Sequence, residues 1–298
     1  MAISGNLPKH LEVAARTGVL AATPNDGDMP WRRVAMEVDL TAKTTTLVDL
    51  GGVPYPTQKP QVVQDMIEKS LSVTPEDWYL TVPISQNAID DDQTGSLLKK
   101  FQGVLPAYYR HINARVFTVL NAGDGQTYGA CYDDQDFFDS DHADPGGSYQ
   151  TAQDNEGALT LSLDNFHTIW VAAQGFMDDQ GHYTNYEYNL LVCHPTSNVL
   201  AANITGNTQA MDTGNRESNP YAGRIGYITA PQLDTTAWHL IASSESVKPM
   251  FVAMRKQPQL IDMKYDSDQP NGGMHYFRYH GRYVVGYGDW RLAKQGNT

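Results

Sequence analysis

The feature that most constrains the fold is a long helical pattern over residues 92–121, where apolar side chains recur every three or four positions. A helix of this length runs along a whole domain and needs other elements to cover its apolar side. Pro106 lies inside the pattern and predicts a kink or a division into two segments. The apolar side consists of Leu97, Leu98, Phe101, Leu105, Tyr108, Ile112, Val116, Val119 and Leu120.

The other elements are expected in separate regions instead of in alternation. Helices are predicted over 162–177 and 197–203, and a buried strand over 188–193. A β-rich region follows, with strands at 225–229, 238–242, 250–254, 275–279 and 282–287, the last two joined by a turn at His280-Gly281. Helices and strands that occupy different regions are typical of the α+β class.

The first part of the chain has a different character. Residues 1–30 hold two short apolar groups between breakers, which predicts an arm that needs another surface to lie on. Strict alternation predicts a long strand over 37–50 and a second over 78–84, with a short helix over 61–71 between them. Two such strands predict a projecting hairpin that packs outside its own core, although the pattern fits strands of an internal sheet equally well.

Length and charge narrow the function classes. A chain of 298 residues is near the upper limit for one core, so two lobes or one domain with extensions are expected. No apolar run is long enough for a membrane span, and we expect a soluble protein made in a cytoplasm. The net charge of −13 argues against a surface built to grip nucleic acid. Cys131 and Cys193 are too few for a disulfide framework, and both are predicted to be small buried hydrophobic residues.

The run 131–142 packs five aspartates, two phenylalanines and a histidine together. Carboxylates and imidazole bind divalent cations, so one alternative is a metal-dependent hydrolase that uses Asp139, Asp141 and His142. The spacing matches neither the EF-hand loop nor a zinc helix with two histidines four residues apart. We therefore favour a structural loop in which the aspartates cap their own backbone.

No other segment carries a catalytic signature. His142, His167, His182 and His194 are expected at the surface or as capping residues. The chain has no nucleophile elbow, phosphate-cradling glycine loop or dinucleotide fingerprint. The sequence thus predicts no catalytic residue, no cofactor and no metal site, and the protein is not expected to be an enzyme.

Four segments, taken in order, carry a family resemblance. They are VPISQNAIDDD at 82–92, the aspartate-rich run 131–142, WHLIASSESVKPMFVAMR at 238–255 and GYGDWRLA at 286–293. Over about residues 79–298 this order resembles the major head subunit gpT of Mu-like phages and prophages.

The resemblance implies the Hong Kong 97-type major capsid fold. On this chain it would place an N-terminal arm at 1–35, an extended loop at 36–88, a peripheral domain at 89–187 with its spine helix at 92–121, an axial domain at 188–247, and a return to the peripheral domain at 248–298. The order of parts agrees with the arm, hairpin and long helix read from the residues alone.

The resemblance also implies a function. The chain would be the major capsid protein of a tailed bacteriophage or prophage, assembling with itself into hexamers and pentamers of an icosahedral shell around double-stranded DNA. Its location would be the virion, after assembly in the host bacterial cytoplasm, with no membrane and no sequence-specific DNA binding. A cellular nanocompartment shell of the same fold, with an internal cargo-docking groove, is the nearer alternative.

Other partners follow from the same resemblance. They are a separate scaffold and protease, a portal and decoration proteins. Because no long charged helical scaffolding segment is visible, we expect this chain to remain uncleaved. Contacts between subunits are expected from a basic pair and from the apolar face of the hairpin: Arg32, Arg33, Val38, Leu40, Val48, Leu50 and Trp78.

Overall fold

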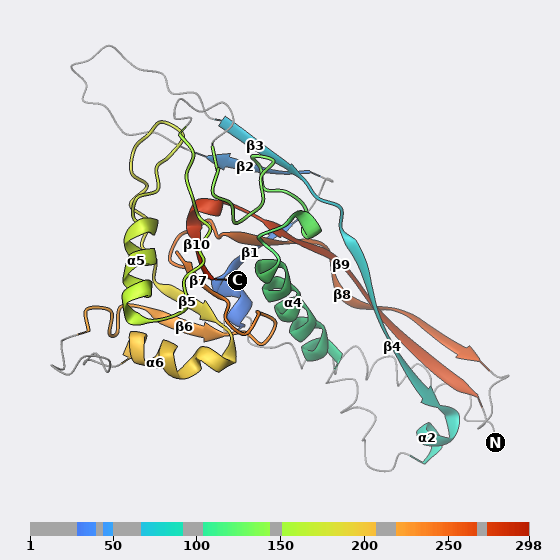
Figure 1. The fold of residues 1–298 in the computed structure, drawn as a ribbon. Helices are drawn as coiled ribbons and strands as arrows, with labels where there is room; N and C mark the ends of the chain where they lie inside the picture. Colours follow the sequence, from blue (N-terminus) through green and yellow to red (C-terminus); the bar gives the residue numbers. More distant parts are fainter. Residues whose placement is uncertain are drawn as a thin grey trace, which may run out of the picture. The chain divides into compact units, whose positions relative to one another are not determined.

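The computed structural model contains both helices and strands (Figure 1). It divides into two compact units. It describes residues 29–39, 44–49, 67–91, 104–143, 151–206, 219–266 and 273–297. The first unit comprises Met1–Met29, Thr74–Ala114 and Ala253–Val284. The second comprises Pro30–Val73, Arg115–Val252 and Val285–Thr298.

The first unit is built on long strands. Strand β4 (Glu76–Ser85) pairs antiparallel with β9 (Met274–Tyr287) over ten residues, from Glu76 opposite Tyr283 to Ser85 opposite Met274. Strand β8 (Met250–Asp266) lies on the other side of β9, and the sheet order is β1-β8-β9-β4, where β1 (Ala35–Asp39) belongs to residues of the second unit. Helix α2 (Gln86–Asp90) follows β4, and the Ser85 hydroxyl accepts a bond from the Ala88 amide.

One face of this sheet carries the core of the first unit. Ile84, Phe277 and Tyr279 pack there against Val104, the first residue of helix α4 (Val104–Asn121). Trp78 joins the same face, with its ring stacked 5.6 Å from that of Tyr283. Alternation along β4 and β9 therefore produces a two-sided sheet whose apolar side is covered by a helix.

The turn predicted at His280-Gly281 is wrong, because β9 runs through it as one strand. Pairing with β4 keeps both residues extended, with His280 opposite Tyr79 and Gly281 opposite Trp78. The glycine has a different role: a Cβ atom there would lie 2.1 Å from the Tyr108 hydroxyl oxygen. Glycine inside a strand often marks such a close approach instead of a turn.

The hairpin has different strands from those predicted. Within 37–50 the described residues belong to two sheets: 37–39 to β1, and 44–49 to β2 (Thr44–Asp49), while 40–43 and 50 lie outside the described part of the chain. Strand β2 pairs with β3 (Ile67–Ser72), with Thr44 opposite Ser72. Strand β3 replaces the end of the helix predicted over 61–71. The four-residue spacing of Ile67 and Leu71 favours a helix, but pairing with β2 overrides it. Segment 78–84 belongs to β4 of the larger sheet and is not the partner of 37–50.

The second unit holds a sheet of order β10-β7-β5-β6. Strand β5 (Leu190–Cys193) runs parallel to β6 (Gly226–Thr229) and antiparallel to β7 (Trp238–Ile241). Strand β10 (Ala293–Asn297) pairs with β7 on the other side. Every residue of β5 and β7 is buried, as expected of central strands.

This unit also contains two helices, α5 (Leu163–Ala173) and α6 (Asn198–Gly206). Its short 3-10 turns are η2 (Pro30–Arg33), η3 (Gln126–Tyr128), η4 (Pro195–Ser197) and η5 (Trp290–Leu292). The Ser162 hydroxyl caps α5 by accepting from the Asn165 amide at 3.1 Å. Helix 162–177 is thus confirmed, although it ends earlier than predicted. Cys131 and Cys193 are free and buried, as predicted.

Helix α4 confirms the end of the long helical pattern. It reaches Asn121, as predicted, while residues 92–103 of the pattern lie outside the described part of the chain. Pro106 lies in α4, and because residues 92–103 on one side of it lie outside the described part of the chain, the predicted kink stays a prediction. Among the described residues, no helix is long and apolar enough to cross a membrane.

Candidate functional site

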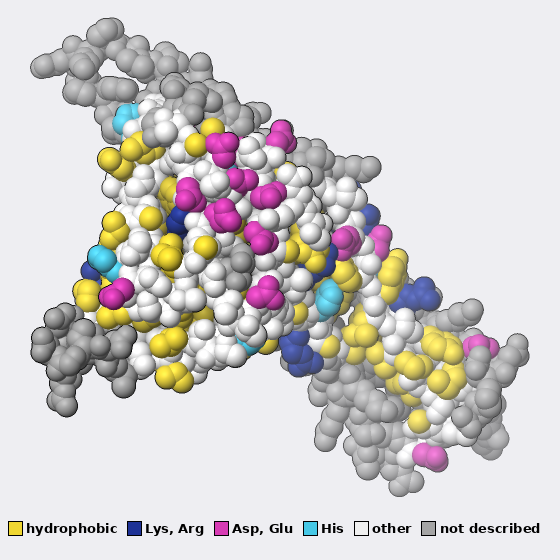
Figure 2. Space-filling model, viewed as in Figure 1, with side chains coloured by type: hydrophobic (Ala, Val, Ile, Leu, Met, Phe, Trp, Pro, Cys, Tyr) yellow, Lys and Arg dark blue, Asp and Glu magenta, His cyan; other side chains and the backbone are white. Residues whose placement is uncertain are grey.

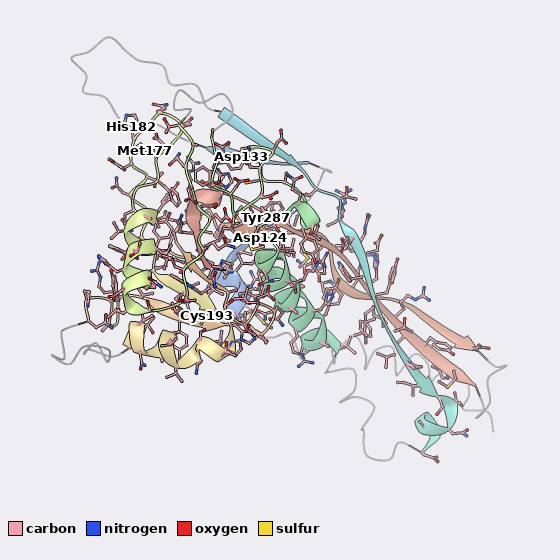
Figure 3. All side chains as sticks on the ribbon, viewed as in Figure 1. Asp124, Asp133, Met177, His182, Cys193 and Tyr287 are labelled. Carbon is pink, nitrogen blue, oxygen red and sulfur yellow. The ribbon has the colours of Figure 1, made fainter. Side chains whose placement is uncertain are left out.

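The aspartate-rich segment forms a loop after α4 that caps itself. Asp139 Oδ1 accepts from the Asp141 amide at 3.0 Å, and Asp133 Oδ1 accepts from the Gln135 amide at 3.4 Å. Asp134 adopts a positive φ of 64°, a conformation that aspartate tolerates better than most residues. Figure 3 labels Asp133 in this loop. The predicted self-capping by aspartates is confirmed.

His142 anchors the end of the loop in the interior. Its ring is fully buried and stacks on Trp290, with centroids 4.3 Å apart and planes 7° apart. Nδ1 lies 2.6 Å from Asp133 Oδ2, and Nε2 lies 3.2 Å from Asn155 Oδ1. Both nitrogens therefore lie within hydrogen-bond distance of an oxygen atom, and the ring is held between the loop and Asn155.

The prediction of a surface or capping histidine is wrong for His142, because its partners come from Asp133, Asn155 and Trp290. It is right for His194, whose ring caps η4 by accepting from the Thr196 amide. His167 is exposed, and the His182 side chain is 40% exposed beside Asp178.

Asn155 is the residue that the sequence reading missed. It is fully buried, and its amide nitrogen donates to the carbonyl oxygens of Phe137 and Trp290 at 2.8 and 3.2 Å. Its Oδ1 accepts from the Asp139 amide at 2.9 Å. One side chain thus ties the loop to the C-terminal segment. A single asparagine within a polar stretch gives no sequence signal for this role.

The hydrolase alternative required Asp139, Asp141 and His142 to converge. Instead, Asp139 caps the Asp141 backbone, and the His142 ring turns to Asp133 and Asn155. In the part of the chain that the structure describes, no group of three or more His, Cys, Asp or Glu side chains is placed to hold a metal ion. The arrangement is that of a structural anchor.

A second buried histidine lies nearby in the same unit. The His239 ring stacks on Phe138, with centroids 5.0 Å apart and planes 7° apart. Neither ring nitrogen has a hydrogen-bond partner among the described residues, and burial lowers the pKa of His239 to about 3. The ring is therefore neutral at physiological pH and acts as a packing element.

The basic pair expected at subunit contacts lies at the start of the second unit. Arg32 donates to Glu37 Oε2 at 2.6 Å, and its guanidinium lies 4.6 Å from the Trp31 ring centroid. Arg33 is exposed, and its guanidinium lies against Gly226, where a Cβ atom would come within 2.8 Å. Val38 is half-buried in β1.

The other expected contact residues are spread over different elements. Val48 is part of β2, while Leu40 and Leu50 lie outside the described residues. Trp78 is half-buried in β4 and packs within its own unit, 4.4 Å from the His111 ring centroid. The described members of the set thus lie on several separate elements.

The fold is shared with solved shell proteins. The procapsid protein of bacteriophage JBD30 is 20% identical with a TM-score of 0.59, over 99% of this chain and 76% of that one. The capsid protein of the empty GTA particle is 12% identical with a TM-score of 0.57, over 90% and 88% of the two chains. The SrpI encapsulin of Synechococcus elongatus PCC 7942 is 9% identical with a TM-score of 0.52, over 92% and 90%.

These likenesses show the Hong Kong 97-type capsid fold, as the sequence resemblance implied. A search of curated proteins found no match. The model of one family, described as the Mu-like prophage major head subunit gpT, matches residues 11–159 and 229–298. That match covers most of the chain and includes α4, the aspartate-rich loop and the strands from β7 onward. The chain therefore belongs to the Mu-like prophage major head subunit gpT family and is a major capsid protein.

Proposed function

We propose that this subunit builds the icosahedral head of a tailed phage or prophage by closing into hexamers and pentamers around double-stranded DNA. The observation that carries the proposal is the family match over residues 11–159 and 229–298. Identical subunits form closed rings through heterologous contacts, in which two different surfaces of the same chain meet. The net charge of −13 is compatible with a wall that does not adhere to the DNA it encloses.

The proposed layout has an arm at 1–35, an extended loop at 36–88, a peripheral domain at 89–187 and 248–298, and an axial domain at 188–247. The β2–β3 hairpin falls inside the extended loop, and strands β5, β6 and β7 fall inside the axial domain. The contact residues proposed between subunits are Arg32, Arg33, Val38, Leu40, Val48, Leu50 and Trp78.

Further partners belong to the same proposal. A separate scaffold and protease guide assembly in the host bacterial cytoplasm, a portal occupies one vertex, and decoration proteins add to the outside. DNA is enclosed without sequence-specific contacts. No enzymatic activity is assigned to the chain.

Negative-stain microscopy of the purified protein, expressed alone and with its gene neighbours, tests the proposal. Closed shells of uniform size are expected, whereas a monomer under both conditions would contradict it. The encapsulin likeness keeps a cargo-carrying nanocompartment as the second candidate. Nuclease treatment of purified particles separates the two, because a phage head from an induced host protects DNA and a nanocompartment protects a protein cargo.

A further inference from the structure

The sheet of the first unit has a second face, opposite its apolar core. Cross-strand pairs place Asp77 opposite Arg282, Tyr79 opposite His280, and Thr81 opposite Arg278. Side chains along a strand alternate between the two faces of the sheet, so these pairs lie on the face that does not carry Leu80, Val82 and Ile84. Tyr79 is 57% exposed there, one of the largest exposures of an aromatic residue in the described chain.

The side chains on this face are held in place by one another. The Tyr79 and His280 rings stack with centroids 4.5 Å apart and planes 10° apart, and the Arg278 guanidinium lies 6.0 Å from the Tyr79 centroid. Asp77 Oδ1 lies 2.8 Å from His280 Nε2 and 2.9 Å from Arg282 Nε. We call these five residues the basic strip. Stacked tyrosine and arginine side chains are the types enriched at protein interfaces, and their fixed geometry lowers the entropy lost on binding.

A surface of opposite charge lies on the second unit. The antiparallel bridge between His142 and Gln153 brings Asp141 beside the segment that carries Asp154 and Glu156, and all three acidic residues are exposed. Lys294 Nζ lies 3.2 Å from Asp154 Oδ1 and offsets part of the charge of that carboxylate, so most of the negative charge here comes from Asp141 and Glu156. Figure 2 shows acidic side chains gathered on one face of the molecule. We call Asp141, Asp154 and Glu156 the acidic patch.

Resting on the proposed function, we infer that the basic strip of one subunit docks against the acidic patch of a neighbouring copy. A shell of identical chains needs two different, mutually complementary surfaces on each chain, and this chain carries such a pair. A polyanion such as DNA is the less suitable occupant of the strip, because the Asp77 carboxylate lies between His280 and Arg282. A protein surface places its carboxylates at separate points and leaves room for Asp77.

Charge reversal tests the docking. Arg278→Glu with Arg282→Glu reverses the strip, and Asp141→Lys with Glu156→Lys reverses the patch. Each pair brings like charges together and is expected to lower the yield of particles by about tenfold or more. The four changes in one chain restore opposite charges across the contact and should recover at least half of the wild-type yield. Particles are counted by microscopy and by sedimentation, and thermal melting of unassembled subunits checks that each variant is folded.

If a reversed variant does not fold, neutral substitutions replace the reversals. For the strip these are Arg278→Gln with Arg282→Gln, and for the patch they are Asp141→Asn with Glu156→Gln. These neutral pairs should raise the protein concentration needed for assembly. Normal yields from the separate reversals, or no recovery in the combined variant, would overturn the docking. Normal particle numbers with less enclosed DNA in the strip variant would overturn it too, in favour of a nucleic-acid contact. Wild-type protein that forms no shells would instead refute the proposed function itself.

Discussion

His239 is a neutral ring enclosed in the core of the second unit, stacked on Phe138. Burial lowers its pKa to about 3, below the ordinary value of 6.5, so the unfolded chain binds a proton in a range where the folded chain does not. The stability that depends on the neutral ring is complete above pH 6.5 and is lost as the pH falls toward 3. Below pH 6.5 this group alone lowers the free energy of unfolding by about 1.4 kcal/mol per pH unit.

We therefore predict that His239→Phe flattens the dependence of stability on pH between 6.5 and 4. The measurement is urea unfolding of the unassembled subunit at several pH values, followed by circular dichroism. His194→Asn is the matched control, because His194 is a half-buried cap of the 3-10 turn η4 and asparagine is also a capping residue. Equal slopes for wild type and His239→Phe would show that the ring titrates normally in the folded chain.

Gly281 gives a second prediction at this scale. A Cβ atom there would lie 2.1 Å from the Tyr108 hydroxyl oxygen, so Gly281→Ala forces this ring or the strand to move and should destabilise the fold by about 1–3 kcal/mol. Tyr108→Phe removes the nearest atom and should recover part of the loss. Gly125→Ala, where no atom lies within 4 Å, should leave the unfolding free energy unchanged when measured by the same denaturation.

Residue-level roles were the least predictable from sequence. His142 reads as a surface residue because it sits among aspartates, yet its ring packs on Trp290, which lies far along the chain near the C-terminus. Aspartate self-capping was predictable, because its partners are only two residues away. Contacts across long sequence separations have no periodic signature.

At the scale of elements, helices were predicted well where their apolar period was sustained. Helix α5 and the end of α4 lie where the three- and four-residue spacings place them. Strands were predicted less well, because pairing partners decide their limits. Strand β9 continues through His280-Gly281 since β4 pairs with it there, and β3 is a strand since β2 pairs with it.

Segment 38–50 carries a prediction about assembly. Val38, Leu40, Ala42, Val48 and Leu50 are the apolar residues at its even positions, and we expect them to cover a neighbouring subunit. Leu40→Asp combined with Val48→Asp should leave a folded, soluble subunit that forms no particles, as seen by negative stain and size-exclusion chromatography. Thr45→Asp, at an odd position of the same segment, is the control and should assemble. Normal particles from the double variant would refute the role of this face.

At the scale of the whole molecule, the α+β class and the capsid fold were both predictable. Four ordered segments carried the family resemblance, and the family match covers all four of them in full. The four segments do not fix the domain limits or the residues that make contacts between subunits. A subunit contact is formed by two chains, and the pattern of one chain contains only half of it.

The absence of a long charged helical segment predicts that the chain stays uncleaved during assembly. Intact-mass measurement of subunits from purified shells should give the mass of the full translated chain. The unassembled subunit measured in parallel is the control for cleavage by host proteases. Loss of several dozen N-terminal residues only in shells would show that maturation includes a cutting step.

Strand β10 is made after every other strand of its sheet, and it is almost completely buried beside β7. The Asn155 amide also donates to the carbonyl oxygens of Trp290 and Ala293, so part of its bonding depends on this last segment. Because β10 is synthesised after the other strands, we expect the buried sheet of the second unit to close only once residues 293–297 have been made.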